Sequence, residues 1–249
     1  MGESAAVQSA RPLVSVITPT YSNNAVLSGR CIPSVVAQTY QPIEHIIVVD
    51  GPNDLPETDT PTRRIVHLGR NWHSFTPEGS WGSMARLVGS GLCRGDYIGY
   101  LDHDDELLPH HVADLVALLE ETDSDFVFGK MTMMRQGYTW PFDRVIGSAP
   151  PRFCHISQDS VIHKAELWHI ANSDPYCRWN KAHLPAGEQI HATYASDWDM
   201  IGRWMEASAK WAFLDKVTMI HHRDNQAELD HLMASAASPL YPYAKRTAN

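Results

Sequence analysis

Residues 13–21 read LVSVITPTY, an apolar and β-branched run that ends at a proline, Pro19. An unbroken apolar run of this length is typical of a strand that is buried on both faces of a parallel sheet. Three later segments resemble it and end in turn or charged residues: EHIIVVDG at 44–51, TRRIVHLG at 62–69 and DYIGYLDHDD at 96–105. Together the four segments predict the core of one sheet.

Helical patterns separate these strands. Apolar residues recur at helical spacing within AVLSGRCIPSVVAQTY (25–40), where Pro33 predicts a kink or a late helix start. The same spacing predicts helices in GSMARLVGSGLCRG (82–95) and PHHVADLVALLEET (109–122), and DFVFGKMTMM (125–134) predicts a further strand. Alternating strands and helices predict an α/β, Rossmann-like fold whose mostly parallel sheet is covered by helices on both faces.

The pattern becomes irregular after about residue 145, where proline and serine are frequent. A helix at 196–209 and a strand at 212–222 are the clear elements of this part, which reads as an extension of the same domain. The expected organisation is a flexible leader, an α/β half, the irregular half and a frayed tail, at residues 1–12, 13–145, 146–225 and 226–249.

The composition excludes several classes of protein. Of 249 residues, 43% are hydrophobic and 20% charged, which suits a globular domain, and the net charge of -9 argues against nucleic acid as a partner. No stretch approaches the roughly 20 apolar residues of a membrane span, and no signal peptide is evident. Four widely spaced cysteines predict free thiols. A cytoplasmic location is therefore expected.

Polar residues follow three of the predicted strands. Thr20 and Tyr21 follow the first, Asp50 the second, and Asp102 to Asp105 the fourth. Ligands of open parallel sheets bind at the carboxyl ends of the strands, so these residues are expected to face one crevice. The alternatives are an ordinary turn at Asp50 and a helix start after Asp102. Three carboxylates in four positions are more than a helix start needs, and they suit Mg²⁺ or Mn²⁺.

Four blocks of the sequence resemble family 2 glycosyltransferases, which have the GT-A fold. Residues 14–54 contain P-T-Y after the first strand, then S-V-x-x-Q-T-Y and I-I-V-V-D-G. Residues 83–105 resemble the family's arginine-bearing helix followed by G-D-Y-I and a D-x-D element. Residues 195–225 resemble its catalytic helix and closing histidine segment. The order of the blocks is more specific than any single block.

The resemblance implies a role for each matching residue. It implies that Asp197 is the catalytic base, although Ser196 precedes it where the family often has an acid. It implies that Asp104 binds the metal, and that His222 contacts the metal or a phosphate, with His221 as the alternative. Asp105 would support the metal ligands without binding the metal itself, or would start a helix. The contacts to the nucleotide would be Thr20, Tyr21, Asp50, Arg86 and Asp102, the last on ribose or metal. Gly51 replaces the family's usual second acid.

Other readings of these segments stay open. Ser196-x-x-Asp199 resembles a capping box, so the acids there could serve only the helix. Trp198 is expected in the core or in the acceptor wall, and His110-His111 at the surface. The glycines of VGSGLCRG fall inside a helix, which argues against a dinucleotide fingerprint.

The resemblance implies an inverting, metal-dependent glycosyltransferase. The donor would be a nucleotide diphosphate-sugar, with UDP or dTDP expected because Asp50 suits an imide N–H, and the acceptor a small molecule or a glycan. Residues 13–145 would bind the donor and residues 146–225 the acceptor. A nucleotidyltransferase is the enzymatic alternative, disfavoured because PTYSNN after the first strand has no glycine. A non-catalytic nucleotide-sugar-binding protein is the other. A homodimer and a monomer both stay open.

Overall fold

The computed structural model of the protein describes residues 11–21, 24–56, 58–72, 82–134, 144–152, 155–172, 174, 176–183 and 196–222. Within these residues nine strands form one sheet in the order β3-β2-β1-β4-β8-β6-β9-β5, with β7 beside β6. The strands are β1 (Val14–Thr20), β2 (Ile43–Val49), β3 (Arg63–His67), β4 (Tyr97–Tyr100), β5 (Glu106–Leu107), β6 (Phe126–Met134), β7 (Arg144–Ile146), β8 (Val161–Lys164) and β9 (Trp211–His222).

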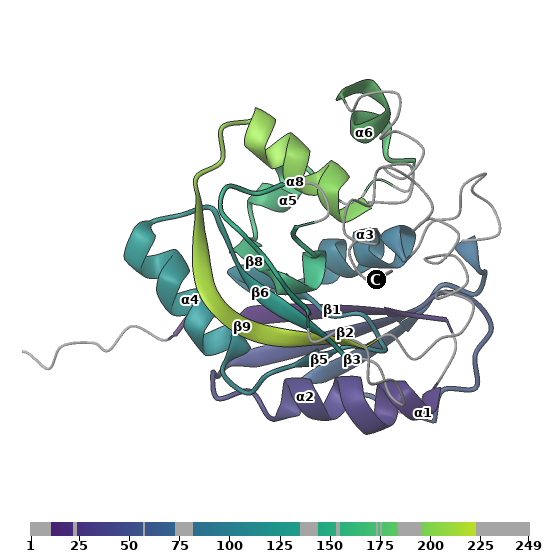
Figure 1. Cartoon of the computed structure of the whole chain (residues 1–249). Coiled ribbons are helices and arrows are strands. Elements are labelled where there is room, and N and C mark those ends of the chain that lie inside the picture. Colours follow the sequence, from purple (N-terminus) through teal and green to yellow (C-terminus); the bar gives the residue numbers. More distant parts are fainter. Residues whose placement is uncertain are drawn as a thin grey trace, which may run out of the picture.

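Helices cover both faces of this sheet (Figure 1). On one side lie α1, α2 and α4, and on the other α3, α5 and α8. The helical elements are α1 (Asn24–Val26), the π-helical turn η1 (Leu27–Cys31), α2 (Ile32–Val36), α3 (Ser83–Leu92), α4 (His111–Thr122), the 3₁₀ turn η3 (Gln158–Ser160), α5 (Leu167–Ile170), α6 (Arg178–His183) and α8 (Ser196–Glu206). The α/β fold predicted from the sequence is confirmed.

The first four strands are parallel. β1 pairs with β2 from Val14↔Ile43 to Thr20↔Val49, and with β4 from Val14↔Tyr97 to Ile17↔Tyr100. The carboxyl ends of the three strands therefore meet at one edge. The expectation that the first strand ends at Pro19 is wrong, because Pro19 pairs opposite Val48 and the strand continues to Thr20.

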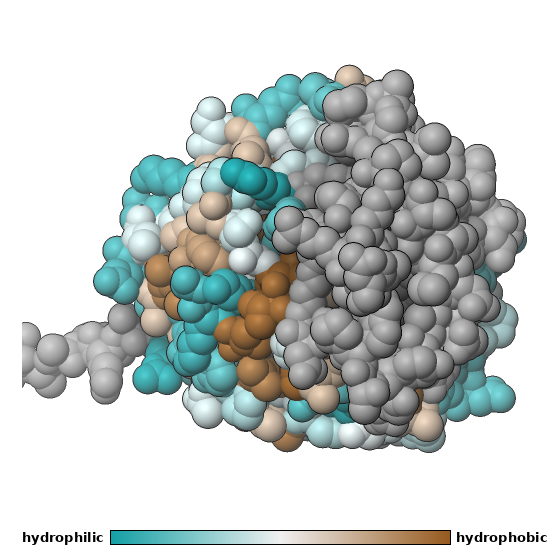
Figure 2. Space-filling model, viewed as in Figure 1, coloured by the Kyte–Doolittle hydropathy of each residue, from teal (hydrophilic) through white to brown (hydrophobic). Residues whose placement is uncertain are grey.

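The second half of the sheet is mixed. β8 pairs antiparallel with both β4 and β6, whereas β9 pairs parallel with β6 from Phe126↔Trp211 to Met134↔His222, with register shifts on both sides of Lys130. The irregular half predicted after residue 145 thus contributes strands to the same sheet. Figure 2 shows apolar residues near the middle of the visible face, with hydrophilic residues on one side of them.

The side chains of each strand alternate between two cores. Val16 points to the face covered by α2 and α4, whereas Ile17 points to the face of α8, where Trp204 is fully buried. The indole N–H of Trp204 donates to the carbonyl of Ala171 at 3.0 Å, so this large side chain leaves no polar atom unsatisfied. The core on this face fixes α8 against the sheet.

Two expectations on this part of the chain can be compared with the structure. His111 was expected at the surface, and this is wrong: it is 1% exposed because the first turn of α4 packs on β9. Burial lowers the pKa of His111 to about 4. The thiols of Cys31 and Cys93 are free, as predicted, and Cys154 lies outside the described residues.

The two ends of the chain lie almost entirely outside the described residues. Residues 1–10 of the predicted leader and the whole predicted tail lie outside the described residues. In the part of the chain that the structure does describe, every helix is too short or too polar to cross a bilayer.

Candidate active site at the carboxyl ends of the strands

Three strand ends come together at one edge of the sheet. The backbone N–H of Asp50 donates to the carbonyl of Thr20 at 2.6 Å, and that of Leu101 donates to Ile17 at 2.9 Å. Thr20 and Asp50 are buried, whereas Tyr21 is 57% exposed at the rim. These polar residues thus lie together, as the rule for open parallel sheets predicts.

The carboxylate of Asp50 is held by the loop after β3. Its Oδ1 accepts the backbone N–H of Trp72 at 2.8 Å. On the other side, the ring of Tyr21 makes an edge contact with the ring of His103, with centroids 5.9 Å apart. Tyr21, Asp50 and His103 thus follow the ends of three neighbouring strands, β1, β2 and β4.

The backbone conformation immediately after Asp50 requires a glycine, which is Gly51. Its φ of +117° is a conformation that side chains disfavour, and an added Cβ would lie 3.0 Å from Cβ of Asn71. A second acid after Asp50, as many family members have, would be strained and crowded here. The departure from the family pattern thus follows from local packing.

Arg86 reaches the site because two glycines let α3 lie close to β1. Gly82 begins the helix with a φ of +78°, and a Cβ on Gly89 would lie 2.5 Å from Ile17. Arg86 is 6% exposed and its Nη2 pairs with Oδ1 of Asp102. Burial opposes its charge, but the carboxylates of Asp102 and Asp159 raise the pKa of Arg86 overall.

The acidic segment after β4 divides its side chains between inside and outside. Asp105 is fully buried, whereas Asp102 and Asp104 are half-buried. Oδ2 of Asp105 lies 2.6 Å from Nδ1 of His221, and Oδ1 accepts the backbone N–H of His222 at 2.9 Å. Asp105 thus connects this segment to β9, and no helix begins at it.

One buried acid was not found by sequence reasoning. Asp159 lies in η3, is 1% exposed, and accepts the backbone N–H of Asp102 with Oδ2 at 3.2 Å. Burial and the charges of Asp102 and Asp105 raise the pKa of Asp159, while His221 lowers that of Asp105 against the effect of its burial. Ligand atoms of Asp102, Asp105 and Asp159 lie within 4.8 Å of one another, so their spacing would suit one cation.

Asp104, the predicted metal ligand, lies beside this group. Its carbonyl accepts a hydrogen bond from Nη1 of Arg30 at 2.6 Å. Burial, followed by the charges of Asp105 and Asp102, raises the pKa of Asp104 to about 7. The segment therefore concentrates negative charge that the described side chains only partly neutralise.

The two neighbouring histidines face different ways. His221 contacts Asp105, whereas Nε2 of His222 lies 3.3 Å from Oε2 of Glu106. His222 also lines a cavity of about 450 Å³ between η1, α2 and β5, together with Arg30. For contact with the acidic group the geometry favours His221 over His222.

Asp197 begins α8 at the far side of the site. Its Oδ1 accepts the backbone N–H of Trp198 at 2.7 Å. Burial raises the pKa of Asp197, the N–H of Trp198 and the charge of Arg86 oppose the rise, and the charge of Asp102 adds to it. Arg86, Asp102 and Asp197 thus act on one another within a single site.

The rest of α8 is structural. The carboxylate of Asp199, which is fully buried, pairs with Arg203 at 2.9 Å one turn along the helix. Trp198 packs partly buried against the core beneath α8. Trp179 of α6 lies flat on Gly202, where an added Cβ would come within 2.3 Å of its ring. These contacts hold the helix that presents Asp197.

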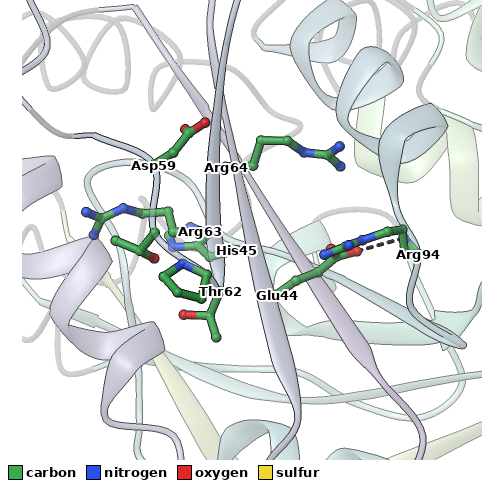
Figure 3. Close-up of a pocket in the computed structure, with 9 residues that line it drawn as sticks. Glu44, His45, Asp59, Thr62, Arg63, Arg64 and Arg94 are labelled. Atoms are coloured by element: carbon green, nitrogen blue, oxygen red, sulfur yellow. Dashed lines mark hydrogen bonds and ion pairs between the residues drawn. The ribbon is translucent and has the colours of Figure 1, made fainter.

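A smaller cavity lies at the opposite end of the strands. It has a volume of about 170 Å³ and is lined by residues of β2 and β3, among them Arg63 and Arg64 (Figure 3). Arg94 pairs with Glu44 at 2.7 Å, and Nη2 of Arg64 donates to the carbonyl of Leu92 at 2.6 Å. Because it lies where β2 and β3 begin, the cavity is separate from the site at the carboxyl ends of the strands.

Comparison with known proteins gives the class. Residues 15–154, more than half of the chain, match the model of glycosyl transferase family 2. The chain belongs to this family. An uncharacterized glycosyltransferase of Rickettsia felis is 32% identical over 151 residues, which are 61% of this chain and 23% of that protein. The poly(ribitol-phosphate) beta-N-acetylglucosaminyltransferase TarP of Staphylococcus aureus is 32% identical over 130 residues, 51% of this chain and 39% of that one.

Solved structures agree on the fold. TarS of S. aureus in complex with UDP has a TM-score of 0.58 at 17% identity, covering 90% of this chain and 64% of that one. The mannosyltransferase PcManGT of Pyrobaculum calidifontis, in complex with GDP-Man and Mn²⁺, has a TM-score of 0.58 at 12% identity, covering 92% and 62%. The predicted GT-A fold is confirmed. The chain spans about a fifth of the length of the first curated relatives it matches.

Proposed function

We propose that the protein transfers a sugar from a nucleotide diphosphate-sugar to an acceptor hydroxyl. The observation that carries this proposal is the meeting of Arg86, Asp102 and Asp197 at the carboxyl ends of the parallel strands. Membership of glycosyl transferase family 2 supports it. So does the fact that structures of the same fold were solved with UDP, UDP-GlcNAc or GDP-Man.

The nucleotide would lie along the first two strand ends. Thr20, Tyr21 and Asp50 would contact its base and ribose, with Arg86 near the base or diphosphate and Asp102 on the ribose or the metal. Asp50 would accept one imide N–H with the carboxylate whose Oδ1 also accepts the N–H of Trp72. Uracil and thymine carry one such donor, which supports UDP or dTDP as the nucleotide.

The acidic segment fits a divalent cation, Mn²⁺ or Mg²⁺. Burial and the charges of Asp105 and Asp102 raise the pKa of Asp104, so a cation beside it would favour its ionised form, and carboxylate oxygens are ligands that these ions prefer. Asp104 would hold the ion together with Asp102. For the histidine, His222 stays a prediction, and the direction of His221 toward the acidic group makes it the better placed of the two. When bound, the cation would neutralise charge on the diphosphate.

Asp197 would act as the general base. Its Oδ1 is bound by the N–H of Trp198, which fixes the carboxylate and leaves Oδ2 to accept the proton of the acceptor hydroxyl. The raised pKa makes this carboxylate a stronger base, and Arg86 favours its ionised form. The acceptor oxygen then attacks the anomeric carbon opposite the leaving diphosphate, and a single displacement inverts that centre. The acceptor would be a small molecule or a glycan.

A donor panel tests this function. The protein is incubated with UDP-, dTDP- and GDP-sugars and Mn²⁺, and release of the nucleoside diphosphate is measured with and without candidate acceptors. Turnover of a uridine or thymidine sugar is expected. Pyrophosphate release from a nucleoside triphosphate and a sugar phosphate would instead identify a nucleotidyltransferase. Tight binding without turnover on any acceptor would identify a binding protein. The predicted cytoplasmic location and the choice between monomer and homodimer stay predictions.

A further inference from the structure

Asp159 enters the site from the antiparallel half of the sheet. It lies in η3, immediately before β8, and its own turn fixes its backbone. The hydroxyl of Ser157 accepts the N–H of Asp159 at 3.4 Å, and the hydroxyl of Ser160 donates to the carbonyl of Ser157 at 2.7 Å. The side chain of Asp159 is therefore delivered to the acidic segment by a rigid support.

The side chain contacts both ends of the turn that follows β4. Oδ2 accepts the N–H of Asp102 at 3.2 Å, and the carboxyl group of Asp159 also donates a hydrogen bond to the carboxylate of Asp105. The turn itself is closed by the N–H of Asp105, which donates to the carbonyl of Asp102 at 3.1 Å. Asp159 thus spans the first and last residues of the segment that contains Asp104.

The same contacts join three parts of the fold. Asp105 is bound by His221 and by the N–H of His222, both in β9. Through Asp105 and Asp159, the end of β4 is therefore connected to η3 and to the last residues of β9. Removal of the Asp159 carboxyl group would leave the N–H of Asp102 and the carboxyl group of Asp105 without these partners in a buried place, which is costly.

We propose that Asp159 is a positioning residue for the donor site: its two hydrogen bonds hold the turn from Asp102 to Asp105, so that Asp102 meets Arg86 and Asp104 faces the donor. The consequence for the donor rests on the proposed function, whereas the consequence for the turn does not. The competing role is that of a metal ligand. Asparagine separates the two roles, because its amide can accept from Asp102 and donate to Asp105 but is a poorer ligand than a carboxylate.

The first experiment measures the turn without any ligand. Hydrogen exchange of peptides covering residues 100–107 is compared in the full chain and in the Asp159→Asn and Asp159→Ala variants. Exchange in Asp159→Asn should match the unaltered protein, and exchange at Asp102 in Asp159→Ala should be faster by about tenfold, as the loss of a buried hydrogen bond predicts. Asp174→Ala is the control: Asp174 is also buried and accepts the N–H groups of Tyr176 and Arg178 at the start of α6, so its loss should leave this exchange unchanged.

The second experiment measures binding of UDP with Mn²⁺ by calorimetry. Asp159→Asn should bind within about threefold of the unaltered protein and Asp159→Ala about tenfold more weakly. Unchanged exchange in Asp159→Ala would overturn the proposal. So would an Asp159→Asn variant that loses Mn²⁺-dependent binding as fully as alanine while its turn stays protected, because the negative charge would then be what matters. If Asp159→Ala does not fold, the folding of Asp159→Asn decides. A folded Asp159→Asn supports the proposal, and an unfolded one overturns it. If the unaltered protein binds no nucleotide, the proposed function fails and the exchange comparison still decides the role of Asp159.

Discussion

The carboxylate of Asp105 and the imidazole of His221 lie 2.6 Å apart, and this contact joins the turn after β4 to the end of β9. Asp105 is fully buried, and Asp105→Ala removes its contacts with the imidazole of His221 and the N–H of His222. We expect a loss of about 3 kcal/mol in the free energy of unfolding, as for other broken buried pairs. Urea unfolding at pH 7 measures it.

The control for this variant is an exposed pair. Asp114 and Lys216 lie 2.6 Å apart on the surface, and Asp114→Ala should cost less than about 1 kcal/mol. An equal loss in the free energy of unfolding of the two variants would contradict the larger contribution expected of the buried contact.

Asp197→Asn separates catalysis from binding. The amide cannot take the acceptor proton, so the transfer rate should fall by roughly 10²–10⁴-fold, while affinity for the nucleotide changes little. Transfer is followed by nucleoside diphosphate release, and affinity by calorimetry. Glu206→Gln, at the exposed end of the same helix, should leave both unchanged. Substantial transfer by Asp197→Asn would refute the role of base.

The raised pKa of Asp104 predicts that metal binding depends on pH. Its pKa is raised to about 7, so below pH 7 a proton occupies the carboxylate and a cation must displace it. The apparent affinity for Mn²⁺ in the presence of UDP should rise about tenfold per pH unit up to pH 7 and then level off. Calorimetry between pH 5.5 and 8.5 tests this. Asp104→Asn should bind weakly at every pH, and a flat profile of the unaltered protein would contradict the assignment.

Three buried histidines predict loss of stability in acid. Burial lowers the pKa of His45 to about 3 and those of His111 and His163 to about 4. The unfolded chain binds protons near pH 6.5 and the folded chain does not, so stability is full above that pH and is lost as the pH falls toward 4. Each histidine contributes up to about 1.4 kcal/mol per pH unit.

Unfolding in urea at a series of pH values checks this slope. His163→Gln removes one of the three groups and should reduce the slope by about one proton. His183, whose side chain is 45% exposed, is the control, and His183→Gln should leave the slope unchanged. A slope that His163→Gln does not alter would contradict the prediction.

Two glycines in helices predict opposite results. A Cβ at Gly202 would lie 2.3 Å from the ring of Trp179, so Gly202→Ala should destabilise the protein by about 1–3 kcal/mol and loosen α6 from α8. A Cβ at Gly91 would lie 3.6 Å from Trp168, an ordinary contact, and Gly91→Ala should be neutral or stabilising by up to about 1 kcal/mol. Thermal unfolding of the two variants measures the difference in stability. Equal stabilities would contradict the prediction that the contact with Trp179 destabilises Gly202→Ala.

Local patterns predicted the parallel half of the fold well. The run at 13–21 and the segments like it became β1 to β4, because an unbroken apolar strand can be satisfied only inside a covered sheet. Their polar ends were then expected at one edge, and Thr20, Asp50 and Asp102 do lie there.

Residues of the antiparallel half were harder to anticipate. Asp159 lies in a short irregular turn, and its importance depends on β8 pairing beside β4, which no periodicity near Asp159 encodes. The directions of His221 and His222 depend on which face of β9 meets the acidic segment. His111 was misplaced because its burial comes from the contact of α4 with β9, a contact between distant segments.

The parallel pairing of β9 with β6 bears on how the molecule is made. β9 is the last described strand, yet it lies between β6 and β5 and supplies the histidines that bind Asp105. His221 follows Asp105 by 116 residues, so the ribosome must synthesise all of these before the turn after β4 can take its final form. Until then the carboxylate of Asp105 lacks its contacts with β9, and one edge of β6 is open to other strands. Nascent chains should depend on protection at that edge, and truncation before β9 should yield aggregates rather than a weakened enzyme.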